Sequence, residues 1–100
     1  METKFTWDPE KAARNSREHG VSFEAALEIF ADPNVVVLEN YHMTDEGEQR
    51  YGAIGMTQSL VLLLVIFVDR SEPNLEVIRI ISARKAERYE SKIYAAHIAN

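Results

Sequence analysis

Basic residues gather late in the sequence, where they could bind an anion. Five bases and two acids fall within residues 79–92, a local charge of +3, and the bases are Arg79, Arg84, Lys85, Arg88 and Lys92. Residues 1–50 carry 11 acids and 5 bases, for −6, whereas residues 51–100 carry 5 acids and 6 bases, for +1. The net charge of −5 excludes a general nucleic-acid coat, because non-specific binding depends on Lys and Arg neutralising phosphates.

Arg79 is the most unusual of these bases, because it interrupts an apolar run from Val77 to Ile81. Arginine is rarely buried without a partner, so its side chain must meet solvent, an acid or a ligand. If Ile78 and Ile80 point at the helices, strand alternation sends Arg79, Ile81 and Ala83 to the opposite face, where a phosphate could dock. An ion pair with a carboxylate such as Glu48 is an equal alternative, and Arg50 raises the same question on another strand.

Arg84 and Lys85 follow Ser82, which can cap a final helix. At the start of a helix the two cations oppose the helix dipole, at a cost of about 0.3 to 1 kcal/mol each. This placement indicates an anion or an acidic partner nearby.

Several chemistries are excluded by what the sequence lacks. There is no cysteine, no glycine-rich phosphate loop and no serine nucleophile elbow. The three histidines lie on different predicted elements, so we expect neither a metal site nor a cofactor. The longest apolar run, residues 60–68, is too short to span a bilayer as a helix, and no export signal opens the chain. We therefore expect a cytoplasmic protein with no membrane partner.

Hydrophobic periodicity and capping residues predict eight elements in one domain, residues 1–100. Strands are expected at residues 4–7, 35–39, 49–56, 60–69 and 75–82, and helices at 9–18, 22–31 and 83–99. The order β-α-α-β-β-β-β-α predicts an α+β fold with an antiparallel β-sheet, two N-terminal helices and one C-terminal helix. We expect the helices on one face of the sheet, which leaves the other face partly open for binding.

Blocks of sequence in a particular order make the chain resemble the BrnT toxin family. The early blocks are Phe5-Thr6-Trp7-Asp8-Pro9-Glu10-Lys11, Asn15, His19-Gly20-Val21-Ser22-Phe23-Glu24 and Phe30-Ala31-Asp32-Pro33. The later blocks are Gly47-Glu48-Gln49-Arg50-Tyr51, Ile54-Gly55, Arg79-Ile80-Ile81-Ser82-Ala83-Arg84-Lys85-Ala86, Glu90 and Tyr94. The resemblance covers nearly the whole chain.

This resemblance implies a RelE-like fold and a type II toxin, a ribonuclease that inhibits translation. It implies neutralisation by a BrnA-type ribbon-helix-helix antitoxin, contact with operator DNA only through that antitoxin, and it allows a homodimer within the complex. The implied chemistry is metal-independent, with the ribose 2′-OH attacking its own phosphate.

Roles for single residues follow from that chemistry as hypotheses. Arg79 and Arg50 would bind the phosphate, with Arg84 assisting. The general base would be Glu48 or His42. RNA-binding roles go to Lys11, Lys85, Tyr51 and Trp7, although the two aromatic residues fit a structural role in the core as well.

A binding module without catalysis is the alternative function. Here the same scaffold would serve only as the antitoxin's partner or as a corepressor. The low basicity and the lack of an obvious general base favour it. A small-molecule enzyme finds no support, because neither an acid pair nor a cofactor motif is evident.

Overall fold

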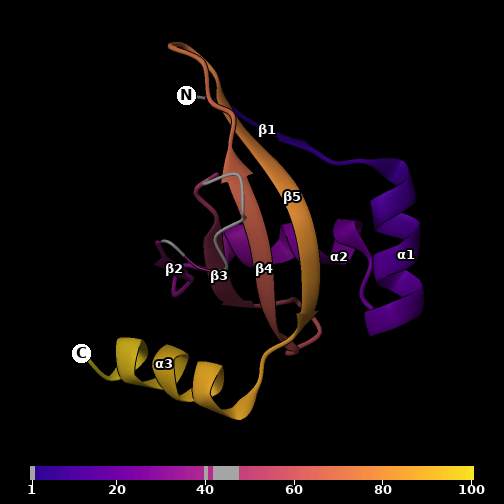
Figure 1. Ribbon diagram of the computed structural model, residues 1–100. Helices are drawn as coiled ribbons and strands as arrows, with labels where there is room; N and C mark the ends of the chain where they lie inside the picture. The colour runs from indigo at the N-terminus through magenta and orange to yellow at the C-terminus, as the bar shows by residue number, and fades with distance from the viewer. Residues whose placement is uncertain (1, 40, 42–47) are drawn as a thin grey trace.

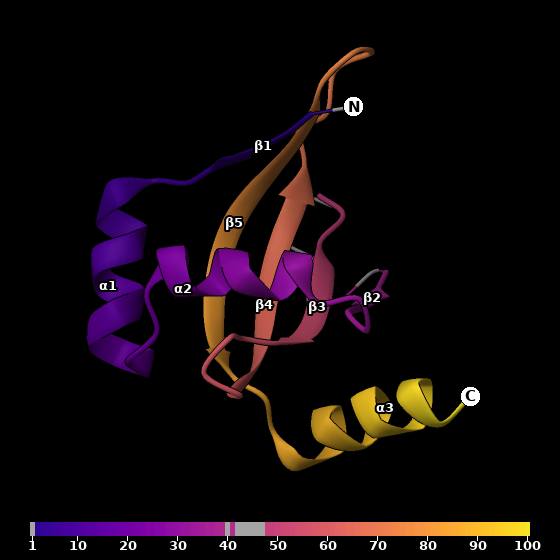
Figure 2. The same cartoon turned by 180° about the vertical axis from the view of Figure 1, so that it is seen from behind.

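The computed structural model describes residues 2–39, 41 and 48–100, so His42 lies outside the described residues. The elements in chain order are β1 (Thr3–Thr6), α1 (Pro9–His19), α2 (Phe23–Leu27), a 3-10 helix (Glu28–Ala31), β2 (Val36–Leu38), β3 (Tyr51–Met56), β4 (Leu62–Asp69), β5 (Glu76–Lys85) and α3 (Arg88–Ala99). Figure 1 shows one twisted sheet with α1 beside an edge. Figure 2, the view from behind, shows α2 crossing the face of the sheet that is turned away in Figure 1. The predicted α+β class and element order are confirmed.

Local signals place the first two helices. Asp8 is the N-cap of α1, and its carboxylate accepts a hydrogen bond from the Glu10 N–H (2.9 Å). Gly20 ends α1 with φ 69°, a left-handed conformation that costs glycine little. Ser22 caps α2 through the Ala25 N–H (3.0 Å).

The sheet has the strand order β1-β5-β4-β3-β2. Its three pairs from β2 to β5 are antiparallel, as expected, but β1 pairs parallel to β5, so the sheet is mixed. The helices α1 and α2, the 3-10 helix and the strands β2 to β4 lie between β1 and β5 in the chain, which leaves enough length for a parallel return. β4 is the central strand, and Leu63–Val68 are all buried, which explains its continuous apolar sequence.

The helices do not share one face, which corrects the sequence-based expectation. One core joins α2 and the 3-10 helix to the sheet through residues that include Phe23, Ile29 and Phe67. On the other face, Tyr94 of α3 packs with Ile54 and Leu64. We call these faces the α2 face and the α3 face. Figure 1 shows α3 across the lower end of the sheet, so the upper part of the α3 face carries no helix.

The boundary between the last strand and α3 also differs from the prediction. Strand pairing continues past Ser82 to Lys85, whose partner is Leu63. The helix begins at Arg88, with Glu87 as its N-cap in a capping box with Glu90. A hydrogen-bonding ladder against β4 therefore outweighs the local capping signal of Ser82.

Within the described ranges, no helix is long and apolar enough to cross a membrane.

Candidate functional site

Arg79 lies on the α3 face at the point where β1 ends. Its neighbours in the sheet are Thr6, the last residue of β1, and Val68 of β4. Ile78 and Ile80 pack toward the α2 face, so the alternation of the strand directs Arg79 to the other face. Across residues 2–39, 41 and 48–100, no ion pair involves Arg79, and the alternative of a pair with Glu48 is not observed.

A β-bulge changes the alternation directly after Arg79. Ile80 pairs with Phe67 and Ser82 with Ile66, so Ile81 is the extra residue on β5. The prediction placed Ala83 on the face of Arg79, but Ala83 is fully buried in the core on the α2 face. The bulge thus moves every later side chain of β5 to the face opposite the one that uninterrupted alternation would give.

As a result Arg84 turns to the α3 face and meets Glu90. Arg84 is in β5 and not at a helix start, and its guanidinium donates two hydrogen bonds to the Glu90 carboxylate (2.8 and 3.0 Å). The Tyr41 hydroxyl (2.5 Å) and the Glu87 N–H (2.8 Å) donate to the same carboxylate, which is fully buried. Burial raises the pKa of Glu90, but these hydrogen bonds outweigh it and lower the pKa to about 2. Arg84 is therefore already paired.

A second charged group lies around Glu48, just before β3. The Arg70 guanidinium donates to the Glu48 carboxylate at 2.9 Å. This hydrogen bond, helped by the charges of Arg70, Arg50 and Lys11, holds the pKa of Glu48 below its usual range, against a smaller opposing effect of desolvation. Glu48 is thus ionised at neutral pH and only weakly basic, while Arg50 and Lys11 lie within electrostatic range of it.

Arg50 carries an unsatisfied donor. Its Nε is buried and has no hydrogen-bond partner in the part of the chain that the structure describes. A buried guanidinium N–H without a partner is costly, and such a group in a charged site indicates a ligand or water that completes it. The backbone carbonyl of Arg50 accepts from the Tyr41 N–H (2.8 Å), which holds this part of the chain at the start of β3.

Three predicted RNA-binding residues lie on the α2 side, away from Arg79. Tyr51 stacks on Phe67 with ring centroids 5.3 Å apart, and Trp7 packs edge-on against Phe23 at 5.8 Å. Both belong to the core on the α2 face. Lys85 lines a different hollow, beside Ser22. Arg50 and Lys11 lie within electrostatic range of Glu48. Arg79 points to the α3 face, whereas Trp7, Tyr51 and Lys85 lie on the α2 side.

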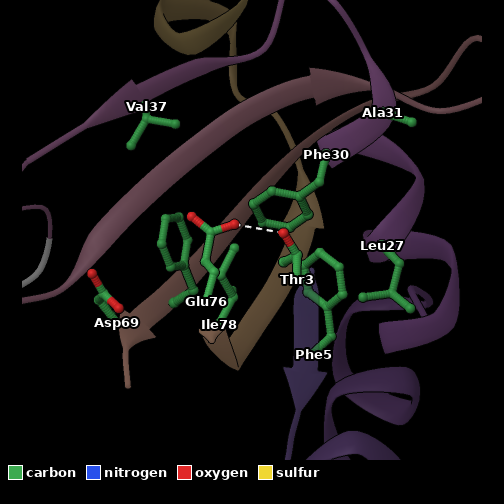
Figure 3. A pocket seen from close by; sticks show the side chains of 10 residues that line it. Thr3, Phe5, Leu27, Phe30, Ala31, Val37, Asp69, Glu76 and Ile78 are labelled. Carbon is green, nitrogen blue, oxygen red and sulfur yellow. Dashed lines mark hydrogen bonds between the residues drawn. The ribbon is translucent and has the colours of Figure 1, made fainter. Parts of the chain in front are cut away.

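A hollow of about 490 Å³ also lies on the α2 side and is poorly suited to RNA. Figure 3 shows its apolar wall, which includes Phe5, Phe30 and Ile78. Its polar edge carries two carboxylates, Asp69 and Glu76, and the latter accepts from the Thr3 hydroxyl (2.6 Å). Two negative charges beside an apolar wall repel phosphate, so this hollow is a poor site for RNA.

Sequence reasoning missed Arg70 and Tyr41. Arg70 comes two residues after Val68, just past the end of β4, so strand alternation could have placed it on the face of Arg79. No local signal pointed to Tyr41, whose hydroxyl meets Glu90 and Tyr89 only through the fold. Among the described residues, no group of His, Asp and Glu could hold a metal ion.

Comparison with known proteins gives the family. The family described as "Ribonuclease toxin, BrnT, of type II toxin-antitoxin system" matches residues 7–90. The crystal structure of the Brucella abortus ribonuclease toxin BrnT is similar, with a TM-score of 0.65 and 28% identity, over 86% of this chain and 99% of that one. No curated protein gives a significant match. The predicted resemblance is confirmed, and the chain belongs to the BrnT family of ribonuclease toxins of type II toxin–antitoxin systems.

Proposed function

We propose that this chain is an active endoribonuclease whose site is the upper α3 face around Arg79. The observation that carries the proposal is the group of charges around Glu48, which pairs with Arg70 and lies within electrostatic range of Arg50 and Lys11. Arg79 is directed to the α3 face by strand alternation and forms no ion pair among the described residues. Phosphoryl transfer needs positive charge where the phosphorane develops, and guanidinium groups can supply it.

In the proposed reaction the ribose 2′-oxygen attacks the adjacent phosphorus and the bond to the 5′-oxygen breaks. Arg79 and Arg50 bind the non-bridging phosphoryl oxygens, and the buried Nε–H of Arg50, which has no partner among the described residues, gains an acceptor. Glu48 accepts the proton of the 2′-OH, with His42 as the other candidate, and the 5′-oxygen leaves with a proton from solvent. Because the pKa of Glu48 is lowered, electrostatic stabilisation by the arginines carries more of the rate than base catalysis.

Arg84 has a different role in this proposal from the one first predicted. Its two hydrogen bonds to the buried Glu90 make it a residue that positions α3 on the sheet. Lys11 provides a further cation for RNA. Lys85, Trp7 and Tyr51 lie on the α2 side of the sheet and do not touch the same phosphate. Trp7 and Tyr51 therefore serve the core.

As a type II toxin, the chain has an antitoxin partner. We further propose that this partner is of the BrnA ribbon-helix-helix type and contacts operator DNA itself. A single domain over residues 1–100, a cytoplasmic location and a homodimer within the complex remain predictions.

The test is induced expression in bacteria of the wild type, Arg79→Ala and the matched control Arg88→Ala, which removes an exposed charge from the start of α3. We expect the wild type and Arg88→Ala to arrest growth, and Arg79→Ala to lose about 100-fold or more in cleavage of a short RNA by purified protein. Products should carry a 2′,3′-cyclic phosphate and a 5′-hydroxyl, with or without EDTA.

Growth arrest by folded Arg79→Ala would refute the site. Normal growth on expression of folded wild type would favour the non-catalytic module, for which the pairing of Arg84 with Glu90 is the specific observation. Products with a 5′-phosphate would refute the mechanism.

A further inference from the structure

A polar groove of about 240 Å³ runs between α1 and β5, next to the proposed site. Ile81 and Ser82 form its sheet side, and the bulge places both on the face of Arg79, two and three residues further along the strand. Figures 1 and 2 both show α1 beside the edge of β5. The groove thus begins where the phosphate site ends.

Its helix side is formed by residues that share one face of α1. Lys11, Arg14 and Glu18 follow the i, i+3, i+7 spacing, and His19 ends the helix. Two cations, one carboxylate and one imidazole therefore line the helix side of the groove, opposite the Ser82 hydroxyl on the sheet side. Throughout the described part of the chain, neither Lys11 nor Arg14 forms an ion pair, so both are available to an anion.

Asn15 makes this groove rigid. Asn15 is 5% exposed. Its side-chain amide pairs with the backbone of β5 as a neighbouring strand would. Nδ2 donates to the Ala83 carbonyl (2.8 Å) and to the Val21 carbonyl (2.9 Å), while Oδ1 accepts from the Ala83 N–H (3.1 Å). Because β1 stops pairing at Arg79, the lower edge of β5 pairs with the Asn15 side chain of α1 in place of a strand. These bonds hold the backbone of α1, which carries the two cations, against β5.

We propose that this groove binds the sugar-phosphate backbone of single-stranded RNA, one or two nucleotides from the phosphate at Arg79. This inference rests on the proposed function and adds a subsite to it. Lys11 links the two, since it lines the groove and lies within electrostatic range of Glu48. A volume of about 240 Å³ is enough for part of one strand.

The experiment measures binding of a fluorescein-labelled 2′-O-methyl octaribonucleotide, which cannot be cleaved because its 2′-oxygens carry no proton. Arg14→Ala should weaken binding about two- to fivefold and reduce the slope of log affinity against log salt by about 0.7, the value for one phosphate contact on a single strand. Arg17→Ala, which removes the same charge from an exposed position of α1 outside the groove, should leave both unchanged.

A second matched pair of variants tests the carboxylate of the groove, whose removal should strengthen RNA binding. Glu18→Gln removes the carboxylate of the groove and should tighten binding, whereas Glu10→Gln, outside the groove on the same helix, should not. Equal effects of Arg14→Ala and Arg17→Ala, or no effect of Arg14→Ala, would overturn the proposal. If the wild type cleaves RNA but Arg14→Ala binds normally, only the subsite fails. If Arg14→Ala weakens binding but the wild type cleaves nothing, only the nuclease proposal fails.

Discussion

Replacing Glu90 with Gln tests how α3 is held on the sheet. The substitution keeps the shape of the side chain but sets an amide against the Arg84 guanidinium, whose side chain is 25% exposed. Removing one partner of a buried ion pair costs about 3 to 5 kcal/mol, and the partial exposure of Arg84 favours the lower end. The fall in the pKa of Glu90 from 4.5 to about 2 corresponds to about 3 kcal/mol as well. We expect Glu90→Gln to lose about 3 kcal/mol at pH 7.

The pH dependence of this loss follows from the sign of the pKa change. The folded pKa is lower than the unfolded one, so the stabilisation is complete well above pH 4.5 and disappears as the pH falls toward 2. By pH 3 about 2 of the 3 kcal/mol should be gone. Urea unfolding of the wild type and Glu90→Gln at pH 7, 5 and 3 measures the difference, in which the other carboxylates cancel. A difference below 1 kcal/mol at pH 7, or one that stays constant with pH, would refute the reasoning.

Two further substitutions test how the helices are attached. Tyr94→Phe removes the hydrogen bond from the buried hydroxyl to the Asp32 carboxylate (2.6 Å) and should cost about 1 kcal/mol in urea unfolding; an unchanged midpoint would show that this bond contributes nothing. Asn15→Ala leaves the Ala83 N–H and carbonyl without partners and should cost about 2 to 3 kcal/mol, with faster hydrogen exchange at the Ala83 amide; normal protection there would contradict the role assigned to Asn15.

Much of the fold could be predicted because its signals are local. Asp8 and Gly20 mark both ends of α1, and the continuous apolar run in β4 reflects a strand buried on both faces. The resemblance to a family was not needed for these elements, since caps and hydrophobic periodicity depend only on neighbouring residues. The alternation of side chains along a strand placed Arg79 on the other face of the sheet from Ile78 and Ile80, in agreement with the structure.

The sequence by itself determined the element order, the α+β class and the resemblance to the toxin family. Only the tertiary structure decided which charges meet. The bulge at Ile81 turns Arg84 to Glu90 and Ala83 into the core, and a bulge depends on the register of β5 against β4, which no local residue pattern contains. Likewise, Glu48 pairs with Arg70 rather than Arg79 because the ends of two strands lie together in space. Long-range pairing therefore set the composition of the site.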